Sequence, residues 1–252
     1  MKPAASAPVA LVPVYNHAAT VGAVVQTLHD LALPVILIDD GSDAECAAAL
    51  DKLASVPTTS LLRLPVNGGK GGAVIAGLRA AHAKGYSHAL QLDADGQHDA
   101  AALPAFLDAM RDAPQAVIVG FPRYDSSVPV GRLLGRYVTH LWVWINTLSF
   151  RIRDSMCGLR IYPLAATLPV LDAMPSQSRM EFDTEILVRL DWAGAPIKNL
   201  PVYVHYPANG VSHFRIGRDN VRISWMHTRL FFGMLWRMPK LIARHFLASE
   251  RR

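Results

Sequence analysis

Short apolar runs alternate with amphipathic stretches through the first 120 residues of the chain. The apolar runs, which favour strands, lie at 8–14, 34–40, 60–65, 88–93 and 115–120, and helical periodicity lies between them at 18–31, 43–54, 72–84 and 100–111. Strands that alternate with helices are typical of an α/β protein with a parallel sheet. Because the strand runs are apolar throughout, we expect helices on both faces of the sheet.

After residue 120 the regular alternation is lost, although no Pro-, Gly- or Ser-rich linker divides the chain. The pattern predicts a helix at 131–150, an apolar run at 157–163, a helix at 180–194, a strand at 197–204 and a loop at 205–215. We therefore expect a lead-in at 1–8, one domain at 9–215 with halves 9–120 and 121–215, and basic amphipathic C-terminal helices at 216–252.

Charge is concentrated at the C-terminal end. Residues 215–252 hold nine Lys and Arg against two acids, a net of +7, and since the whole chain carries +5 the first 214 residues carry −2. At about 100° per residue, Arg218, Arg222 and Arg229 fall within roughly 40° of one another on a helix, beside Trp225 and Trp236. This pattern favours an anionic surface as partner, although the arginines could equally form a solvated face. No recognition motif accompanies the charge, so we expect no nucleic acid.

Composition points to a cytoplasmic protein. The two cysteines show no C-x-x-C pattern, which is typical of a reducing compartment. The N-terminus has one basic residue and a short apolar run broken by prolines, so it is a poor signal peptide. No window reaches the roughly 18 uninterrupted apolar residues that a spanning helix needs.

Four polar segments follow predicted strands: "PVYN" (13–16), "DDGS" (39–42), "NGGKGG" (67–72) and "DADGQH" (93–98). Ligands of open parallel sheets bind at the carboxyl ends of the strands. We expect the four segments to meet in one crevice.

Asp93 and Asp95 are candidate metal ligands. Residues i and i+2 of an extended chain point the same way, so both carboxylates can face one hard cation such as Mg²⁺ or Mn²⁺. Gln97 would supply a third oxygen. The alternative is a solvated acidic turn in which Asp99 caps the next helix.

The other two acidic or glycine-rich segments are also open to two interpretations. Asp40 could accept a hydrogen bond from a nucleotide base or ribose, or the segment could be a turn with Ser42 or Asp43 as a helix cap. Lys70 among four glycines at a helix start suits phosphate, although a flexible turn would look the same. It is not a Walker A loop, because Gly71 follows the lysine.

Taken in order, "VPVYN", "IDDGS", "NGGKGGAVIAGL", "LDADGQH" and "DSMCGLRIY" resemble the family 2 glycosyltransferases, in particular the branch that acts on dolichyl and polyprenyl phosphates. The resemblance covers residues 9–235. It implies the GT-A nucleotide-diphospho-sugar transferase fold, a UDP- or GDP-sugar donor, Mg²⁺ or Mn²⁺, a lipid-linked acceptor and inversion at the anomeric carbon. Half 9–120 would bind the nucleotide and half 121–215 the acceptor.

The resemblance also assigns donor-side residues. Pro13, Tyr15 and Asn16 match a "P-x-Y-N" segment and, with Asp40, would line the nucleoside pocket. Asp93, Asp95 and Gln97 match the metal motif, so Asp93 would lie beside the donor, and Lys70 is expected there from its glycine-rich helix start.

Arg160 matches the arginine of a "D-x-x-x-G-x-R-x-Y" segment and is expected to contact phosphate near the reacting centre. With the metal it would stabilise the charge that develops on the leaving diphosphate. The acceptor phosphate would be oriented by Arg123, Arg132 and Arg136, with His213 and Arg215 in a loop that could close over it. Arg123 departs from the branch's "G-x-R-Y" spelling by one residue, as "GFPRY".

A phosphate acceptor attacks without a general base, whereas a hydroxyl acceptor of another lipid or glycan needs one. Glu181 and Asp183 in "RMEFDTEI" are both candidates, and structural ion pairs are an equal alternative for either.

The sequence also bears on membrane attachment and on two other classes of protein. The branch places amphipathic helices at the membrane surface, so attachment would be peripheral, at the inner face of the cell membrane, or through a partner. A nucleotidyltransferase would carry a Gly-rich basic loop after the first strand, where this chain has "VYNHAAT". A non-catalytic receiver-like signalling module would place its acidic pair after the first strand, whereas "DD" follows the second.

Overall fold

The computed structural model describes residues 7–124, 130–174, 179–204 and 216–249 of the 252-residue chain. In these ranges the strands are β1 (Pro8–Val14), β2 (Val35–Asp39), β3 (Thr59–Arg63), β4 (His88–Gln91), β5 (Val117–Tyr124), β6 (Arg160–Pro163) and β7 (Ile197–Val204). They form one sheet in the order β3-β2-β1-β4-β6-β5-β7. β6 runs antiparallel to β4 and β5, and the other pairings are parallel. The predicted mostly parallel sheet is confirmed.

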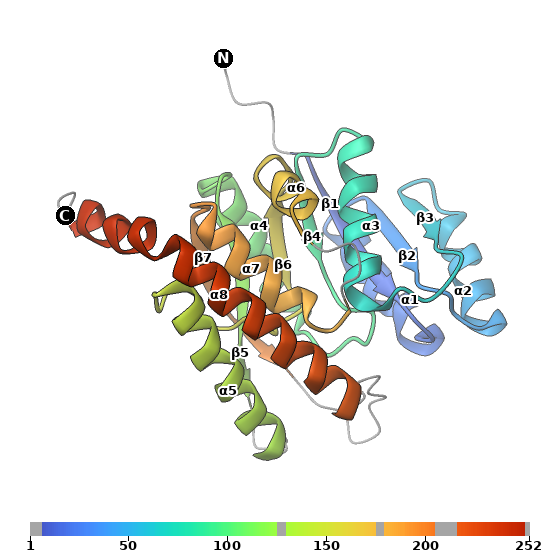
Figure 1. The fold of residues 1–252 in the computed structure, drawn as a ribbon. Helices are drawn as coiled ribbons and strands as arrows, with labels where there is room; N and C mark the ends of the chain where they lie inside the picture. The colour runs from blue at the N-terminus through green and yellow to red at the C-terminus, as the bar shows by residue number, and fades with distance from the viewer. Residues whose placement is uncertain (1–6, 125–129, 175–178, 205–215, 250–252) are drawn as a thin grey trace.

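Helices cover both faces of the sheet (Figure 1). One layer contains α1 (Ala18–Asp30), α2 (Ala44–Ala54) and α4 (Leu103–Asp112), which follows the short η1 (Ala100–Ala102). The other contains α3 (Gly69–Ala83), α5 (Val130–Thr147), α6 (Leu164–Asp172), α7 (Phe182–Trp192) and α8 (Ile216–Ser249).

The alternation of side chains along β1 shows why both layers are needed. Val9 and Leu11 belong to the core beneath α3, whereas Ala10 and Val12 belong to the core beneath α1. All four are fully buried. Successive residues of a strand point to opposite faces, so an apolar run requires cover on both sides.

Two helices differ from the pattern-based expectation. α6 was not predicted, and Pro169 lies inside it. The C-terminal region is one helix of 34 residues that continues through Pro239, where several helices were expected. None of the helices within the described ranges is long and apolar enough to cross a membrane.

Two predicted caps are present. The Asp43 side chain accepts from the backbone N–H of Cys46 at the start of α2, and the Asp99 side chain accepts from Ala101 at η1, both at 2.9 Å. The capping interpretation of these acids is therefore correct, and it leaves Asp39, Asp40, Asp93 and Asp95 to be explained separately.

Candidate active site

The four polar segments that follow strands do lie together at the carboxyl edge of the sheet. The backbone N–H of Asp40 donates to the Val14 carbonyl at 2.9 Å, and that of Asp43 donates to the Asn16 side chain at 2.8 Å. The Thr20 hydroxyl, in α1, donates to the carbonyl of Ala94 at 2.6 Å. These hydrogen bonds join the ends of β1, β2 and β4 into one continuous surface.

At the end of β1, Pro13 and Tyr15 are half-buried and Asn16 is exposed. Asn16 has φ 57°, in the left-handed region that asparagine tolerates, and its N–H donates to Ser42 at 3.2 Å. The turn after β1 is thereby held against the turn after β2. Pro13, Tyr15 and Asn16 thus lie together at the end of β1, and their contact with a nucleoside stays a prediction.

Asp40 does not have the free carboxylate expected of a nucleotide ligand. Its two oxygens accept from the backbone N–H groups of Gly68 and Gly69 at 2.7 and 2.9 Å. Burial raises the pKa of Asp40, and the two glycine N–H groups and the Arg179 charge offset this only in part. Asp40 is therefore the anchor of the glycine-rich segment, and its expected contact with a base or ribose does not fit this arrangement.

The glycine-rich segment is likewise not an open phosphate cradle. The N–H groups of Gly68 and Gly69 are bound by Asp40, and that of Gly71 donates to the Arg179 carbonyl at 3.1 Å. Its charged group, Lys70, instead reaches the end of β4.

Lys70 bridges two carboxylates at the centre of the site. Its ammonium lies 2.8 and 2.9 Å from the oxygens of Asp93 and 2.9 Å from Asp183. Burial alone would lower the pKa of Lys70, but Asp183 and Asp93 together raise it well above its usual range. Burial likewise opposes ionisation of Asp93, yet Lys70 and His98 hold the pKa of that carboxyl below its ordinary value. Lys70 and Asp93 are therefore both charged across the physiological range.

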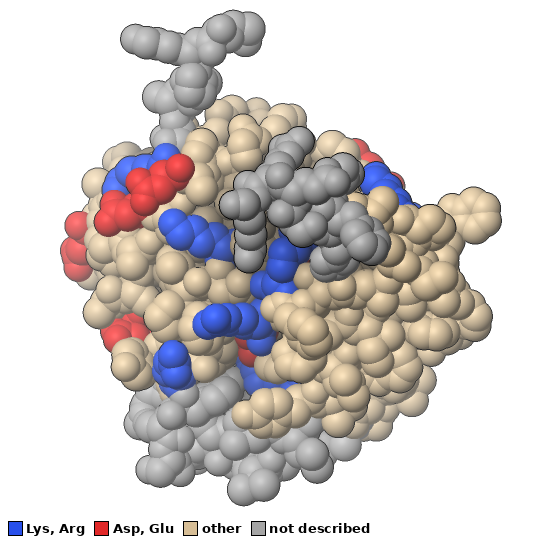
Figure 2. Space-filling view, turned by 90° about the vertical axis from the view of Figure 1, so that its left-hand side faces the viewer, with Lys and Arg blue, Asp and Glu red and all other residues tan. Residues whose placement is uncertain are grey.

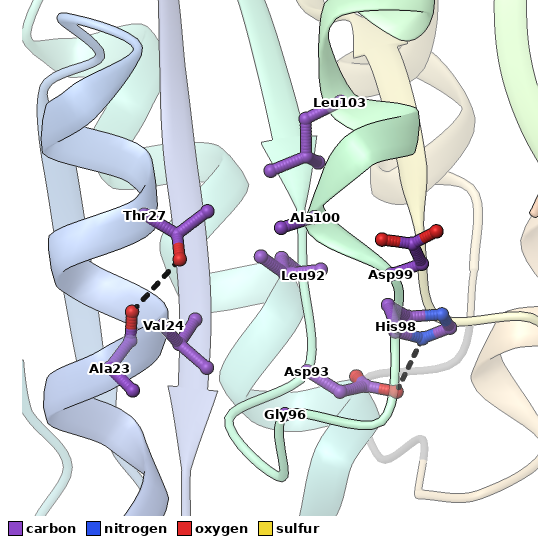
Figure 3. Close-up of a pocket in the computed structure, with 10 residues that line it drawn as sticks. All are labelled: Ala23, Val24, Thr27, Leu92, Asp93, Gly96, His98, Asp99, Ala100 and Leu103. Atoms are coloured by element: carbon purple, nitrogen blue, oxygen red, sulfur yellow. Dashed lines mark hydrogen bonds and ion pairs between the residues drawn. The ribbon is translucent and has the colours of Figure 1, made fainter. Parts of the chain in front are cut away.

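Asp93 also lies against Gly158 and beside a pocket. A Cβ added at Gly158 would meet the Asp93 carboxylate oxygen at 2.0 Å, so only glycine fits there. Figure 3 shows the Asp93 and His98 side chains turned toward each other, and the His98 Nε2 lies 3.8 Å from an Asp93 carboxylate oxygen. The pocket continues from this pair toward Val24 and Leu103, between α1 and the start of α4.

Asp95 and Gln97 complete the predicted metal motif, and the donor set fits a hard divalent cation. Burial and repulsion from Asp93 raise the pKa of Asp95, and a cation placed between the two carboxylates would relieve that repulsion. Asp95 itself accepts from the backbone N–H of Gln97 at 3.0 Å. Within the described ranges no three His, Cys, Asp or Glu side chains form a metal site alone, so the other ligands would come from substrate and water.

The two candidate bases differ in their surroundings. Both are buried, but Asp183 is paired with Lys70 and accepts from Gln91 at 3.2 Å. Glu181 accepts from the Arg179 N–H at 3.2 Å through one oxygen, while its other oxygen is buried without a hydrogen-bond partner among the described residues. Glu181 thus has one carboxylate oxygen that can still accept a hydrogen bond or a proton.

Arg160 does not have the expected position. It is fully buried, and its guanidinium donates to the carbonyl oxygens of Cys157, Asp183 and Ser155 at 2.8, 2.6 and 2.6 Å. A phosphate has no access to a group held in this way, so we correct the expected phosphate contact. Arg160 instead fixes the segment before β6 and the start of α7 relative to each other.

On the acceptor side, two exposed arginines share one aromatic ring. The guanidinium carbons of Arg123 and Arg153 lie 5.4 and 5.1 Å from the ring centre of Phe121. Neither arginine is paired with a carboxylate of a described residue. Arg153 was not predicted, because in "RIRD" it looks like an ordinary surface residue, and only its approach to Phe121 in the fold reveals it.

The remaining predicted arginines contribute differently. Arg136 pairs with Asp154, which also binds His140 and is almost fully buried. This ties α5 to the segment before β6, so Arg136 is not the free phosphate ligand that was expected. The Arg132 side chain lies outside the described part of the structure, as do His213 and Arg215.

The chain has the GT-A fold, with a mostly parallel seven-stranded sheet and helices on both faces. Residues 9–167 match the family described as Glycosyl transferase family 2. The chain belongs to this family and is a glycosyltransferase.

Relatives and solved structures agree with this assignment. The chain is 29% identical over 204 residues to the undecaprenyl-phosphate mannosyltransferase of Micrococcus luteus, covering 76% of this chain and 81% of that protein. It is 24% identical to a UDP-N-acetylglucosamine–dolichyl-phosphate N-acetylglucosaminyltransferase of Methanococcus voltae, over 82% and 90% of the two chains. Glucosyl-3-phosphoglycerate synthase of Mycobacterium tuberculosis, solved with Mn²⁺ and UDP-glucose, superimposes with a TM-score of 0.63 at 15% identity, over 91% of this chain and 79% of that one.

Proposed function

We propose that this protein is an inverting, metal-dependent glycosyltransferase that moves a sugar from a nucleotide-diphospho-sugar to a polyprenyl phosphate. The observation that carries the proposal is the paired carboxylates Asp93 and Asp95 at the end of β4, with the exposed arginines Arg123 and Arg153 at the end of β5 and before β6. The first group suits a cation and a diphosphate, and the second suits a phosphate dianion. Relatives named for undecaprenyl- and dolichyl-phosphate transfer support this combination.

On the donor side, Pro13, Tyr15 and Asn16 would bind the nucleoside at the end of β1. Asp93, Asp95 and Gln97 would hold Mg²⁺ or Mn²⁺, which when bound supplies positive charge to the departing diphosphate. Lys70 holds the Asp93 and Asp183 carboxylates in place before the donor arrives.

On the acceptor side, Arg123 and Arg153 would orient the polyprenyl phosphate. A phosphate oxygen attacks the anomeric carbon from the face opposite the diphosphate, the bond to the diphosphate breaks, and the configuration inverts. The attacking oxygen carries no proton, so no base is required.

A hydroxyl acceptor is the second candidate, because Glu181 has a buried carboxylate oxygen without a partner among the described residues. Such an acceptor must lose a proton as it attacks, and Glu181 would take it. The two candidates therefore differ in whether Glu181 is needed: replacing it by Gln should abolish transfer to a hydroxyl and spare transfer to a phosphate.

Release of nucleoside diphosphate from a panel of UDP- and GDP-sugars, with Mg²⁺ or Mn²⁺ and a polyprenyl phosphate, tests the donor and metal assignments. Asp95→Asn should lower turnover by at least about 100-fold. Asp99→Asn, in the same loop but only a cap, should leave it unchanged. Equal turnover in both variants would remove the metal role of Asp95.

We also propose that the protein binds the cytoplasmic face of a membrane peripherally, through α5 and α8. Large apolar side chains are exposed on these two helices: Tyr137 (66%), Leu141 (55%), Trp225 (63%), Phe232 (65%) and Trp236 (86%). The helices pack together through Trp142 and Phe231, whose rings lie 6.2 Å apart. Figure 2 shows a broad uncharged surface beside a band of Lys and Arg. Such surfaces suit the headgroup layer.

The contribution of the basic residues is smaller than the sequence pattern indicates. Arg229 donates to the buried Glu185 at 3.2 Å, and Arg222 lies 3.7 Å from Asp219, so only part of the predicted basic sector is open to anionic headgroups. Membrane binding should therefore depend more on the exposed aromatic side chains than on the salt-sensitive attraction between arginines and anionic headgroups.

Co-sedimentation with phosphatidylcholine vesicles, with and without phosphatidylglycerol, tests this surface. Replacing Trp225 and Trp236 together by Ser should weaken binding by at least about 10-fold. Val56→Ser, which removes an exposed apolar group from the end of α2, is the control. Vesicle binding that is unchanged in the double variant would contradict the proposed surface.

A further inference from the structure

Arg179 holds the glycine-rich segment and the acidic segment before α7 together. Its guanidinium donates to the side chain of Asn67 at 3.0 Å and to the backbone carbonyl of Asn67 at 3.1 Å. Its own carbonyl accepts from the N–H of Gly71, and its own N–H donates to Glu181. One residue thus contacts the segment around Lys70 through both side chain and backbone, and Glu181 through its backbone.

The packing around this contact is close. Gly69 has φ +79°, and a Cβ placed on it would lie 2.6 Å from the Arg179 Cγ. Glycine is thus required at this position both by backbone conformation and by the approach of Arg179.

The same segment is fastened to the donor side. Asp40 at the end of β2 accepts from Gly68 and Gly69, and the Asn67 side chain donates to the Asp40 carbonyl at 3.0 Å. Lys70 then connects the segment to Asp183 at 2.9 Å. An unbroken chain of hydrogen bonds therefore runs from the proposed nucleoside pocket, through residues 67–71, to the two acids at the start of α7.

Both terminal guanidinium nitrogens of Arg179 donate to Asn67, which directs the side chain toward the glycine-rich segment. We therefore consider the effect that Arg179 has through the groups it holds. Displacement of the segment would change the position of Lys70, and with it Asp183, without altering the residues at the end of β1.

We propose that Arg179 is a positioning residue that couples occupation of the donor site to the placement of Glu181 and Asp183. This inference rests on the proposed function, since it takes the donor to be a nucleotide-diphospho-sugar bound beside residues 67–71. Binding of the nucleotide orders the segment around Lys70, and Arg179 transmits that order to the start of α7.

Amide hydrogen exchange of the full chain, with and without the nucleoside diphosphate of the active donor and Mn²⁺, measures the coupling directly. In the wild type the nucleotide should slow exchange at residues 67–72 and also at 181–187. In Arg179→Ala it should still slow exchange at 67–72 but should slow it less at 181–187, because the side-chain contact with Asn67 is lost. Arg79→Ala, which breaks an exposed pair with Asp172, is the control and should behave as wild type.

Kinetics give the second measurement. Arg179→Ala should lower kcat at least about 10-fold, with nucleotide affinity changed by less than about 3-fold. Asn67→Ala should act through the same contact, so the double variant should be no worse than the poorer single variant. Arg179→Lys, which keeps the charge but not the two-pronged contact, should recover little.

The failures of the two proposals are distinguishable. A wild type that binds no nucleotide removes the proposed function. Nucleotide binding with equal protection of 181–187 in wild type and Arg179→Ala, or additive losses in the double variant, overturns the coupling and leaves the function standing.

Discussion

Asp93 was predicted from sequence as a metal ligand, and the fold places a positively charged side chain, the Lys70 ammonium, beside it. Lys70, 23 positions earlier in the chain, lies between Asp93 and Asp183. The lysine therefore preorganises the carboxylates, because two acids close together would otherwise repel each other. Sequence spacing cannot reveal this arrangement, since it depends on α3 being packed against the end of β4.

Gly158 is a sharp test of the position of Asp93. A methyl group at residue 158 would overlap the Asp93 carboxylate, so Gly158→Ala should displace it from Lys70 and lower turnover by at least about 10-fold. Gly22→Ala in α1, where an added Cβ meets no atom within 4 Å, is the matched control and should retain activity. The assay is donor turnover beside a thermal melt, and full activity in Gly158→Ala would contradict the placement of Asp93.

Arg153 carries a second prediction at this scale. Arg153→Ala should raise the KM for polyprenyl phosphate by about 10-fold, because it removes one of two cations from the proposed phosphate site. Arg111→Ala, which removes an exposed arginine paired with Asp108, should not change it. Donor KM measured on the same variants should stay constant, and an unchanged acceptor KM in Arg153→Ala would exclude its role.

Residue types at strand ends were predictable, whereas side-chain direction was not. The acids and glycines stand out because each follows an apolar run. Arg160 was placed on phosphate by resemblance, but it starts β6 between two strands and is fully enclosed. Whether an arginine faces a cleft or the interior depends on tertiary pairing, which no local pattern records.

At the scale of elements, α5 and α8 meet at a buried histidine, and we expect this contact to depend on pH. His227 on α8 is buried, stacks on Trp142 with ring centres 5.9 Å apart, and lies 3.3 Å from the Asn146 side-chain nitrogen. Burial lowers the pKa of His227 to about 4. The native state therefore holds this imidazole neutral.

The resulting stability is present above the unfolded pKa of about 6.5 and is lost as pH falls toward 4. Urea unfolding at pH 7 and pH 4.5 should show a loss that includes at most about 3 kcal/mol from His227. His227→Gln, which cannot titrate but can still accept from Asn146, should lose less over the same interval. Identical pH dependence in both proteins would contradict the assignment.

The two helices that differ from the prediction, α6 and α8, both contain a proline, whereas the helices with strong periodicity were predicted correctly. α6 and α8 contain Pro169 and Pro239, residues that ordinarily end or kink a helix. Tertiary packing of Leu164, Leu171 and Leu241 into the core compensates for the lost hydrogen bonds. The alternating first half was read correctly because its strands are apolar on both faces.

At the scale of the whole molecule, the site lies along one edge of a single sheet. The proposed donor residues are at the ends of β1 and β4, the proposed acceptor arginines are at the end of β5 and before β6, and the exposed faces of α5 and α8 lie on the layer that covers that second half. With this arrangement, a lipid phosphate would reach the donor from the membrane while it stays in contact with the protein surface.

The most direct measurement is transfer of radiolabelled sugar from UDP- and GDP-sugars into the organic phase in the presence of a polyprenyl phosphate and Mn²⁺ or Mg²⁺. We predict label in the lipid, nucleoside diphosphate released in equal amount, an inverted anomeric configuration, and loss of both signals in Asp95→Asn. Nucleoside diphosphate release that ignores the polyprenyl phosphate, with label entering a hydroxyl acceptor instead, would contradict the proposed acceptor.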